Sequence, residues 1–143
     1  DMVGPYGYCA DISRSFVVGN KFNDEQKKLY SMAMEQIDFN SRLIKNGVNF
    51  KEFTEKSWVL PKEYYPNRYS VMVHGIGLCD EWPAIRYPTD GGERGGTFQK
   101  NMTITVESYI GKVGGKEGVK LEQQYLIGEN GLELMSHHPL EDI

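Results

Sequence analysis

Two glutamates stand in the middle of apolar, strand-forming sequence. Glu107 follows Thr-Ile-Thr-Val, and Glu122 lies within Val-Lys-Leu-Glu-Gln-Gln-Tyr-Leu. A carboxylate on the inner face of a strand must be paired or bound to a metal ion, because burying an isolated charge is very costly. His74 ends a third strand-like run and precedes the turn of residues 75–77. Carboxylates and an imidazole together suit a pair of divalent ions such as Mn, Fe, Co or Zn.

Two aspartates flank a predicted hairpin near the start of the chain. Asp1 and Asp11 lie on either side of a Gly-Pro-Tyr-Gly turn at residues 4–7, and a hairpin brings its distant ends together. Two ions about 3.5–4 Å apart need bridging carboxylates, and Asp11 or Glu122 could bridge. The candidate metal ligands are therefore Asp1, Asp11, His74, Glu107 and Glu122.

Each of these residues also has an ordinary structural interpretation. A single strand glutamate usually faces solvent or pairs across the sheet. His74 could be a hydrogen-bonded structural histidine, and Asp11 could pair with Arg14 at a turn. Their joint order along the chain is what favours a metal site.

Size and charge limit the classes of function. The chain has 143 residues, and its 16 Lys and Arg against 20 Asp and Glu give a net charge of −4. We expect one domain, residues 1–143, and no nucleic-acid or membrane partner, because the chain is acidic and has no apolar run of roughly 20 residues. Cys9 and Cys79 form no disulfide framework, which favours the cytoplasm. Because the first residue is Asp1 and not Met, we expect a piece of a longer protein.

Periodicity predicts strands, two helices and further strands. Asn23 is a suitable N-cap with Gln26 three residues later, and Gly47 is a C-terminal stop. The fold class is therefore α+β with a mostly antiparallel sheet. The expected elements are a hairpin whose second strand covers 8–18, helices over 24–46 and 50–58, a strand over 69–73, a loop over 80–100, and strands over 102–110, 119–127 and 132–135.

Five short motifs, in order, carry a family resemblance. They are Cys-Ala-Asp-Ile-Ser-Arg-Ser-Phe at 9–16, Gly-Asn-Lys-Phe at 19–22, His-Gly-Ile-Gly at 74–77, Thr-Val-Glu at 105–107 and Gly-Val-Lys-Leu-Glu at 118–122. This set resembles the aminopeptidase P, prolidase and creatinase group, which shares the pita-bread fold with methionine aminopeptidase. The resemblance implies the C-terminal part of such a catalytic domain, with a curved sheet and flanking helices, and a homodimer. It also implies two metal ions held by Asp1, Asp11, His74, Glu107 and Glu122.

The segment after His74 departs from the peptidase pattern. Peptidases carry a second histidine within about seven residues of the metal histidine, whereas residues 78–83 here read Leu-Cys-Asp-Glu-Trp-Pro. The site therefore lacks a histidine that could donate a hydrogen bond or a proton, and it gains carboxylates that can accept a proton. This exchange favours proton abstraction over amide hydrolysis. The segment resembles one branch, the dimethylsulfoniopropionate (DMSP) lyases. This implies a catalytic Asp80, a functional Tyr69 and iron as the metal. A Xaa-Pro metallopeptidase is the alternative, and a non-catalytic binding module is a third possibility.

The implied substrate is a small zwitterion with a carboxylate and a sulfonium. Metal binding at the carboxylate would acidify the neighbouring carbon, and partial burial would raise the pKa of Asp80 so that it acts as the base. Aromatic faces attract a sulfonium, and Tyr6, Tyr8 and Trp82 are the candidate binding residues. Ordinary packing of these rings, and a turn-capping or ion-paired Asp80, remain alternatives.

Overall fold

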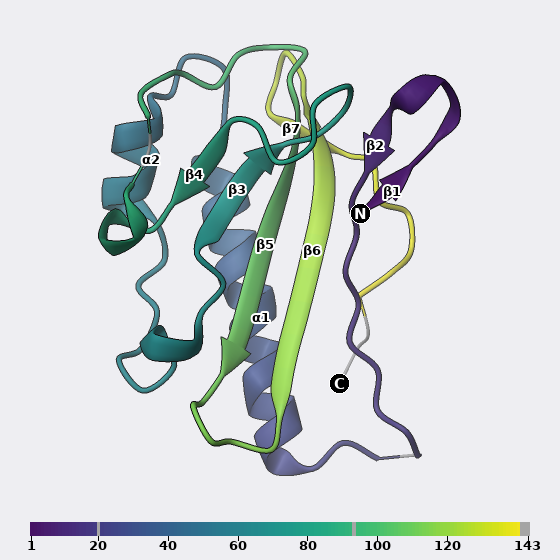
Figure 1. The fold of residues 1–143 in the computed structure, drawn as a ribbon, viewed down its shortest axis with the longest axis vertical. Coiled ribbons are helices and arrows are strands. Elements are labelled where there is room, and N and C mark those ends of the chain that lie inside the picture. The colour runs from purple at the N-terminus through teal and green to yellow at the C-terminus, as the bar shows by residue number, and fades with distance from the viewer. Residues whose placement is uncertain (20, 93, 141–143) are drawn as a thin grey trace.

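A five-stranded antiparallel sheet with one long helix behind it forms the body of the protein (Figure 1). The computed structural model describes residues 1–19, 21–92 and 94–140. The sheet has the strand order β4-β3-β5-β6-β7, and β1 and β2 form a separate small hairpin. The elements are β1 (Met2–Val3), β2 (Cys9–Ala10), α1 (Asp24–Leu43), α2 (Phe50–Lys56), β3 (Val71–Gly75), β4 (Ala84–Arg86), β5 (Thr103–Gly111), β6 (Gly118–Ile127) and β7 (Leu132–Leu134), with 3-10 turns at Pro5–Gly7, Tyr65–Asn67 and Pro88–Asp90.

Local signals fix the start of α1. The Asn23 side chain accepts a hydrogen bond from the Gln26 amide, and the Gln26 side chain accepts one from the Asn23 amide. This reciprocal capping satisfies two amide groups that a helix start leaves unbonded. The predicted start is confirmed, but the helix ends at Leu43, three residues before the predicted end, because Ile44 adopts an extended backbone.

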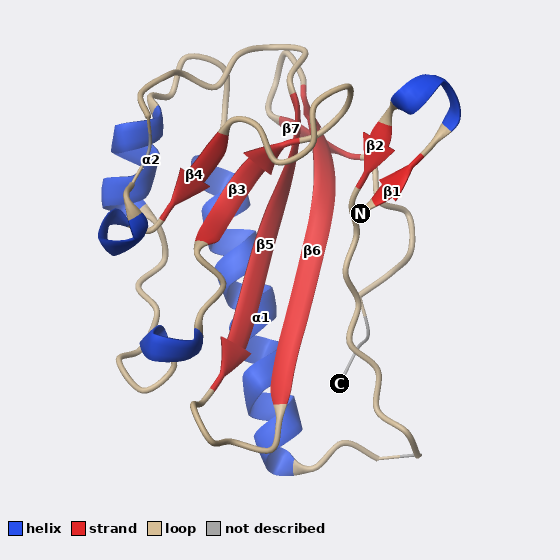
Figure 2. Ribbon diagram, viewed as in Figure 1, coloured by secondary structure: helices blue, strands red, loops and turns tan. Residues whose placement is uncertain are grey.

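The alternation of β5 and β6 separates an apolar face from a polar one. Val106 and Leu121 are fully buried in the hydrophobic core with α1, which packs along β5 and β6. Residues one position along, Glu107 and Glu122, are register partners and therefore point to the opposite face. Figure 2 shows α1 behind the sheet, so the polar face is the one without a helix.

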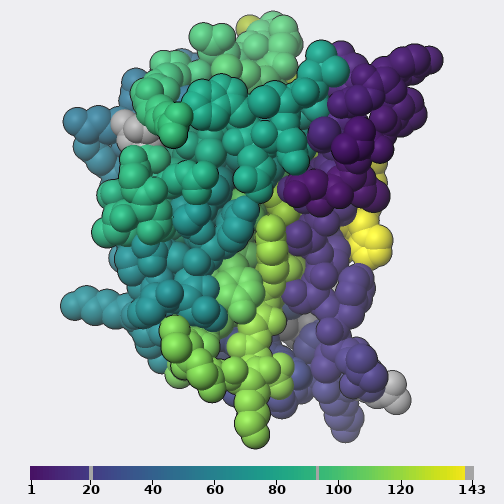
Figure 3. Space-filling view, viewed as in Figure 1, coloured from purple at the N-terminus to yellow at the C-terminus, as the bar shows by residue number. Residues whose placement is uncertain are grey.

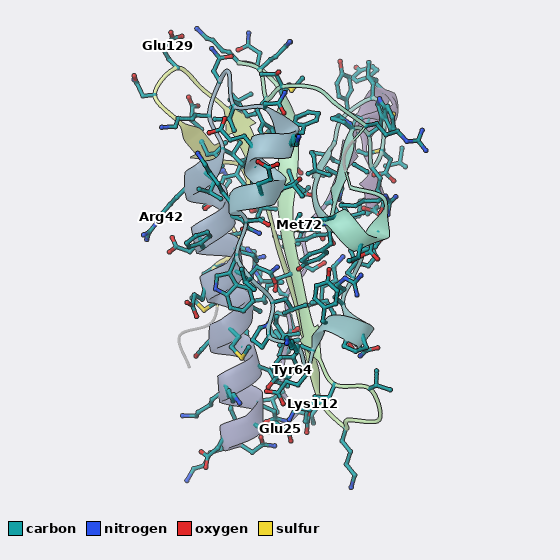
Figure 4. The ribbon with its side chains drawn as sticks, turned by 90° about the vertical axis from the view of Figure 1, so that its left-hand side faces the viewer. Glu25, Arg42, Tyr64, Met72, Lys112 and Glu129 are labelled. Carbon is teal, nitrogen blue, oxygen red and sulfur yellow. The ribbon has the colours of Figure 1, made fainter. Side chains whose placement is uncertain are left out.

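Tyr64 and Lys112 cover the end of the hydrophobic core that lies near the start of α1. Tyr64 is 2% exposed, and the Lys112 ammonium lies 5.6 Å from its ring centroid. Figure 4 shows both residues at the end of the sheet near the start of α1, while Arg42 points away from the sheet. No helix of the described residues is long and apolar enough to cross a membrane.

The N-terminal segment differs from its predicted strand. The expected second strand over 8–18 is only two residues long, because the segment beyond Ala10 leaves β1 and runs beside β6. There it bonds largely through side chains: the Ser15 hydroxyl donates to the Lys120 carbonyl and accepts from the Lys120 amide. Figure 3 shows this purple segment against the strand, with its hairpin beside the teal loop that follows β3.

The predicted 80–100 loop contains a strand that the sequence did not reveal. Ala84–Arg86 pairs with β3 as β4, and the chain between them forms a tight loop over residues 76–83. Only three residues pair, which is too short for a periodic signal. The Gly75 amide donates to the Pro83 carbonyl at 2.8 Å and closes the base of this loop.

We predict that Gly75→Ala displaces this loop. A Cβ atom at Gly75 would lie 2.2 Å from the Trp82 carbonyl oxygen and 2.8 Å from Pro83 Cδ. Overpacking of this kind costs about 1–3 kcal/mol, which should appear as a lower unfolding midpoint in thermal denaturation of the intact protein. Gly115→Ala is the matched control, since its nearest atom would be 3.1 Å away in a surface turn. An unchanged midpoint for Gly75→Ala would contradict this packing.

Candidate metal centre

Three predicted ligands from distant parts of the chain meet on the polar face of the sheet. Potential ligand atoms of Asp11, His74 and Glu122 all lie within 4.8 Å of one another, and all three residues are buried. His74 Nε2 lies 3.6 Å from Asp11 Oδ2 and 3.3 Å from Glu122 Oε1. Since the residues come from β3, β6 and the segment after β2, the sheet and the N-terminal segment must both be in place to build the cluster.

Glu107 and a lysine complete the charged group. Glu107 Oε1 lies 3.7 Å from His74 Nε2, and its side chain is 1% exposed. The Lys120 ammonium lies 2.9 Å from Glu107 Oε2 and 3.3 Å from Glu122 Oε2. Lys120 shares the face of Glu122 because the two residues are two positions apart on one strand. One imidazole and one ammonium therefore face three carboxylates.

The unbonded oxygens of this cluster fit a metal ion. Within the described residues, Glu107 Oε1 and Glu122 Oε1 are buried without a hydrogen bond, whereas Glu107 Oε2 is paired with the Lys120 ammonium. Buried polar atoms normally have a partner, and an unsatisfied one suggests an ion or water. The donor set of carboxylates and one imidazole is that of Mn, Fe, Co or Zn. Asp11, His74, Glu107 and Glu122 would hold the metal.

Burial and mutual contact shift the pKa values of these groups. Burial, followed by the charge of Glu122, raises the pKa of Glu107 to about 7 and also raises that of Asp11. Burial alone would lower the pKa of His74, but Glu122, the Gly75 carbonyl and Glu107 raise it to about 9. The pKa of Glu122 falls despite its burial, because His74 and Lys120 stabilise its charged form. Without metal, His74 is therefore protonated at neutral pH.

The segment after β2 positions Glu122. The Ser13 hydroxyl donates to Glu122 Oε2 at 2.9 Å, and the Glu122 amide donates to the Ser13 carbonyl at 3.1 Å. Arg14 donates to the Glu122 carbonyl and, at 2.5 Å, to the Gln123 side chain. Arg14 therefore holds the β6 backbone and does not pair with Asp11, the alternative that the sequence left open.

The predicted Asp1 ligand is not brought into the cluster. Asp1 is exposed, and no described contact joins its carboxylate to the other predicted ligands. The group of three ligands found among the described residues does not include its carboxylate. Asp1 precedes β1, whose residues Met2 and Val3 pair with β2.

The predicted aromatic residues do not surround the cluster. Tyr6 and Tyr8 lie in the exposed β1–β2 hairpin, 95% and 56% exposed. Trp82 is 52% exposed, and the Arg94 guanidinium lies 5.6 Å from its ring centroid. Trp82 and Arg94 also line a hollow of about 210 Å³ beside β4. Of the three rings, Trp82 is thus the one that already faces a cation.

Tyr69 contacts both Lys120 of the cluster and Glu81 of the loop that follows β3. The Lys120 ammonium lies 4.8 Å from the Tyr69 ring centroid, and the Tyr69 hydroxyl donates to Glu81 Oε1 at 2.9 Å. Burial and the Glu81 hydrogen bond raise the pKa of Tyr69 to about 12, so its hydroxyl stays protonated. Asp80 is exposed in the same loop, so the partial burial expected for it is not found.

Two members of this arrangement, Lys120 and Glu81, were not predicted from the sequence. Lys120 carried a usable signal, because it stands two residues before Glu122 in a strand and must share its face. Glu81 carried no such signal in the sequence, since its contact with Tyr69 depends on how the loop after β3 folds.

We predict that metal binding becomes tighter as the pH rises. His74 and Glu107, with pKa values of about 9 and 7 in the metal-free protein, must lose protons to act as ligands. Calorimetric titration of metal into the metal-free intact protein should show more proton release and weaker affinity at pH 6 than at pH 9. His138→Asn, at an exposed histidine whose ring packs on Phe16, should leave this dependence unchanged. An affinity that is constant over this range would contradict the assignment of these ligands.

Comparison with known proteins finds relatives that match almost the whole chain. The chain is 38% identical over 145 residues to the dimethylsulfoniopropionate lyase DddP of Roseovarius nubinhibens, which covers 99% of this chain and 32% of that protein. It is 32% identical over 134 residues to the Xaa-Pro dipeptidase of Pyrococcus furiosus, which covers 90% of this chain and 36% of that protein. The chain therefore spans about a third of the length of these curated relatives.

Solved structures show the same architecture. The prolidase of Pyrococcus horikoshii superposes with a TM-score of 0.76 at 28% identity, over 95% of this chain and 38% of that one. The X-Pro aminopeptidase of Thermotoga maritima gives a TM-score of 0.72 at 30% identity, over 94% and 37%. The expected α+β fold, the C-terminal part of a pita-bread domain, is confirmed. Since residues 1–129 match metallopeptidase family M24, the chain belongs to this family.

Proposed function

We propose that the intact protein is a metal-dependent carbon–sulfur lyase that cleaves DMSP to dimethyl sulfide and acrylate. The observation that carries this proposal is the loop after His74, which presents Asp80 and Glu81 and no imidazole. The other two histidines, His137 and His138, lie beyond β7, and the described ligand cluster contains only His74. The name of the Roseovarius relative supports the same reaction.

The proposed step is an elimination across two carbons. A base removes a proton from the carbon next to the substrate carboxylate, the electron pair forms the carbon–carbon double bond, and the carbon–sulfur bond breaks. Dimethyl sulfide leaves with the bonding electrons, so the sulfonium loses its charge. Asp80 is the proposed base, because it stands six residues after His74 on the loop that follows β3, and an exposed carboxylate there can receive the proton and pass it to solvent.

The chain supplies binding groups for both ends of the zwitterion. A metal ion held by Asp11, His74, Glu107 and Glu122 would act as a Lewis acid toward the substrate carboxylate. Trp82 is the proposed contact for the sulfonium, since its ring already faces the Arg94 guanidinium. We further propose two ions, most favourably iron, with Asp1 as an additional ligand, and a homodimer of the intact protein. Tyr6 and Tyr8 would contribute only if the exposed hairpin closes over the site.

The alternative is a Xaa-Pro metallopeptidase. The Xaa-Pro dipeptidase of Pyrococcus furiosus is 32% identical over 134 residues, and the prolidase of Pyrococcus horikoshii shares the fold. Peptide hydrolysis requires donation of a proton or hydrogen bond to the tetrahedral intermediate, and the described residues place no second imidazole at the cluster for it.

We predict that the intact protein releases dimethyl sulfide from DMSP and leaves a Xaa-Pro dipeptide uncleaved. Headspace gas chromatography measures the first reaction, and detection of free proline measures the second. Prior removal of the metal with a chelator should abolish the release, and re-addition should restore it. Cleavage of the peptide without release of dimethyl sulfide would contradict the lyase proposal and favour the Xaa-Pro metallopeptidase.

For the base, we predict that Asp80→Asn lowers turnover by a factor of about 10²–10⁴ and leaves the metal content intact. The amide cannot accept the proton, but it does not alter the cluster. Asp38→Asn, at an exposed carboxylate on α1 that pairs with Arg42, is the matched control and should behave as wild type. Loss of metal in Asp80→Asn would indicate that Asp80 is a metal ligand. Wild-type turnover of the variant would show that Asp80 takes no part in the mechanism.

A further inference from the structure

The loop that carries Asp80 is tied to the sheet at few points. Its base is closed by the bond from the Gly75 amide to the Pro83 carbonyl, and the Cys9 amide donates to the Gly77 carbonyl at 2.8 Å. Beyond Gly77, the bond from Tyr69 to Glu81 is the one side-chain hydrogen bond that joins residues 78–82 to the rest of the described chain. The position of Asp80 therefore depends on its neighbour Glu81.

Glu81 has a backbone conformation that requires support. Its φ angle is +50°, in the left-handed region that side chains other than glycine rarely adopt. A residue keeps such a conformation only where surrounding contacts stabilise it, and residues of this kind are frequent at functional sites. Here the holding contact is the Tyr69 hydroxyl, 2.9 Å from Glu81 Oε1.

Tyr69 is itself held by the charge of the metal-ligand cluster. The Lys120 ammonium is fixed between Glu107 and Glu122, and it lies 4.8 Å from the centre of the Tyr69 ring. A cation at this distance is attracted by the ring face. Contacts therefore run without a break from the ligands through Lys120 and Tyr69 to Glu81.

We propose that Lys120, Tyr69 and Glu81 form a latch that fixes the Asp80 loop against the metal centre. All three are positioning residues: Lys120 orients the Tyr69 ring, and Tyr69 holds the Glu81 turn that presents Asp80. This inference rests on the proposed function only for the role of Asp80. It assigns Tyr69 to the support of the loop instead of direct contact with the substrate.

The test is a double-mutant cycle on the two ends of the hydrogen bond. Tyr69→Phe and Glu81→Ala each remove the bond and should each lower kcat about tenfold or more, as expected for a hydrogen bond to a charged group. The double variant should lose no more than the single ones, because both changes break one interaction. Metal content should stay at the wild-type level. Tyr65→Phe removes a hydroxyl bonded to Thr89 outside the latch and is the matched control.

Hydrogen exchange measured by mass spectrometry gives a second readout that does not need activity. The amides of Gly75 and Cys9, which donate to the Pro83 and Gly77 carbonyls that bound this loop, should exchange faster in the two single variants, in the double variant and in Lys120→Met, whereas Lys120→Arg should restore slow exchange. A double variant whose kcat loss is the product of the single losses would show that Tyr69 acts separately, and would overturn the latch. Unchanged exchange would overturn it as well. If wild type releases no dimethyl sulfide, the lyase proposal fails, and the exchange data still decide on the latch.

Discussion

The structure depends on the burial of two glutamates that lie directly opposite each other in neighbouring strands. Glu107 and Glu122 are register partners in β5 and β6 and are 1% and 0% exposed. Like charges in such a pair repel, and burial increases the cost. Positive charge must therefore be present between them: Lys120 and protonated His74 supply it in the metal-free chain, and a metal ion would supply it in the loaded protein.

This requirement explains how the surrounding elements are arranged. α1 covers one face of the sheet with apolar contacts, which leaves the other face free for charged groups. The segment after β2 brings Asp11 and the Ser13 hydroxyl to this polar face, and Arg14 fastens the segment to the β6 backbone. The lysine that neutralises the glutamates also contacts Tyr69, so the electrostatics of the cluster extend to the loop that carries Asp80.

Family membership and chemistry are separate questions for this chain. The fold is shared with solved Xaa-Pro peptidases, and residues 1–129 match family M24, but fold and family do not select a reaction. The proposed lyase chemistry rests on the short loop after His74, which carries the carboxylates of Asp80 and Glu81 and no imidazole. The position of that loop therefore matters for the proposed reaction.

The sequence by itself determined the long elements, and it predicted residues that the structure brings together in the buried cluster. Capping at Asn23 and the alternation around Glu107 and Glu122 are local, so α1, β5 and β6 could be predicted closely. Only the tertiary structure decided that Lys120 pairs with both glutamates, that Tyr69 bonds Glu81, and that Ala84–Arg86 forms a strand. Those contacts join residues far apart in the chain, or pair too few residues to leave a periodic pattern.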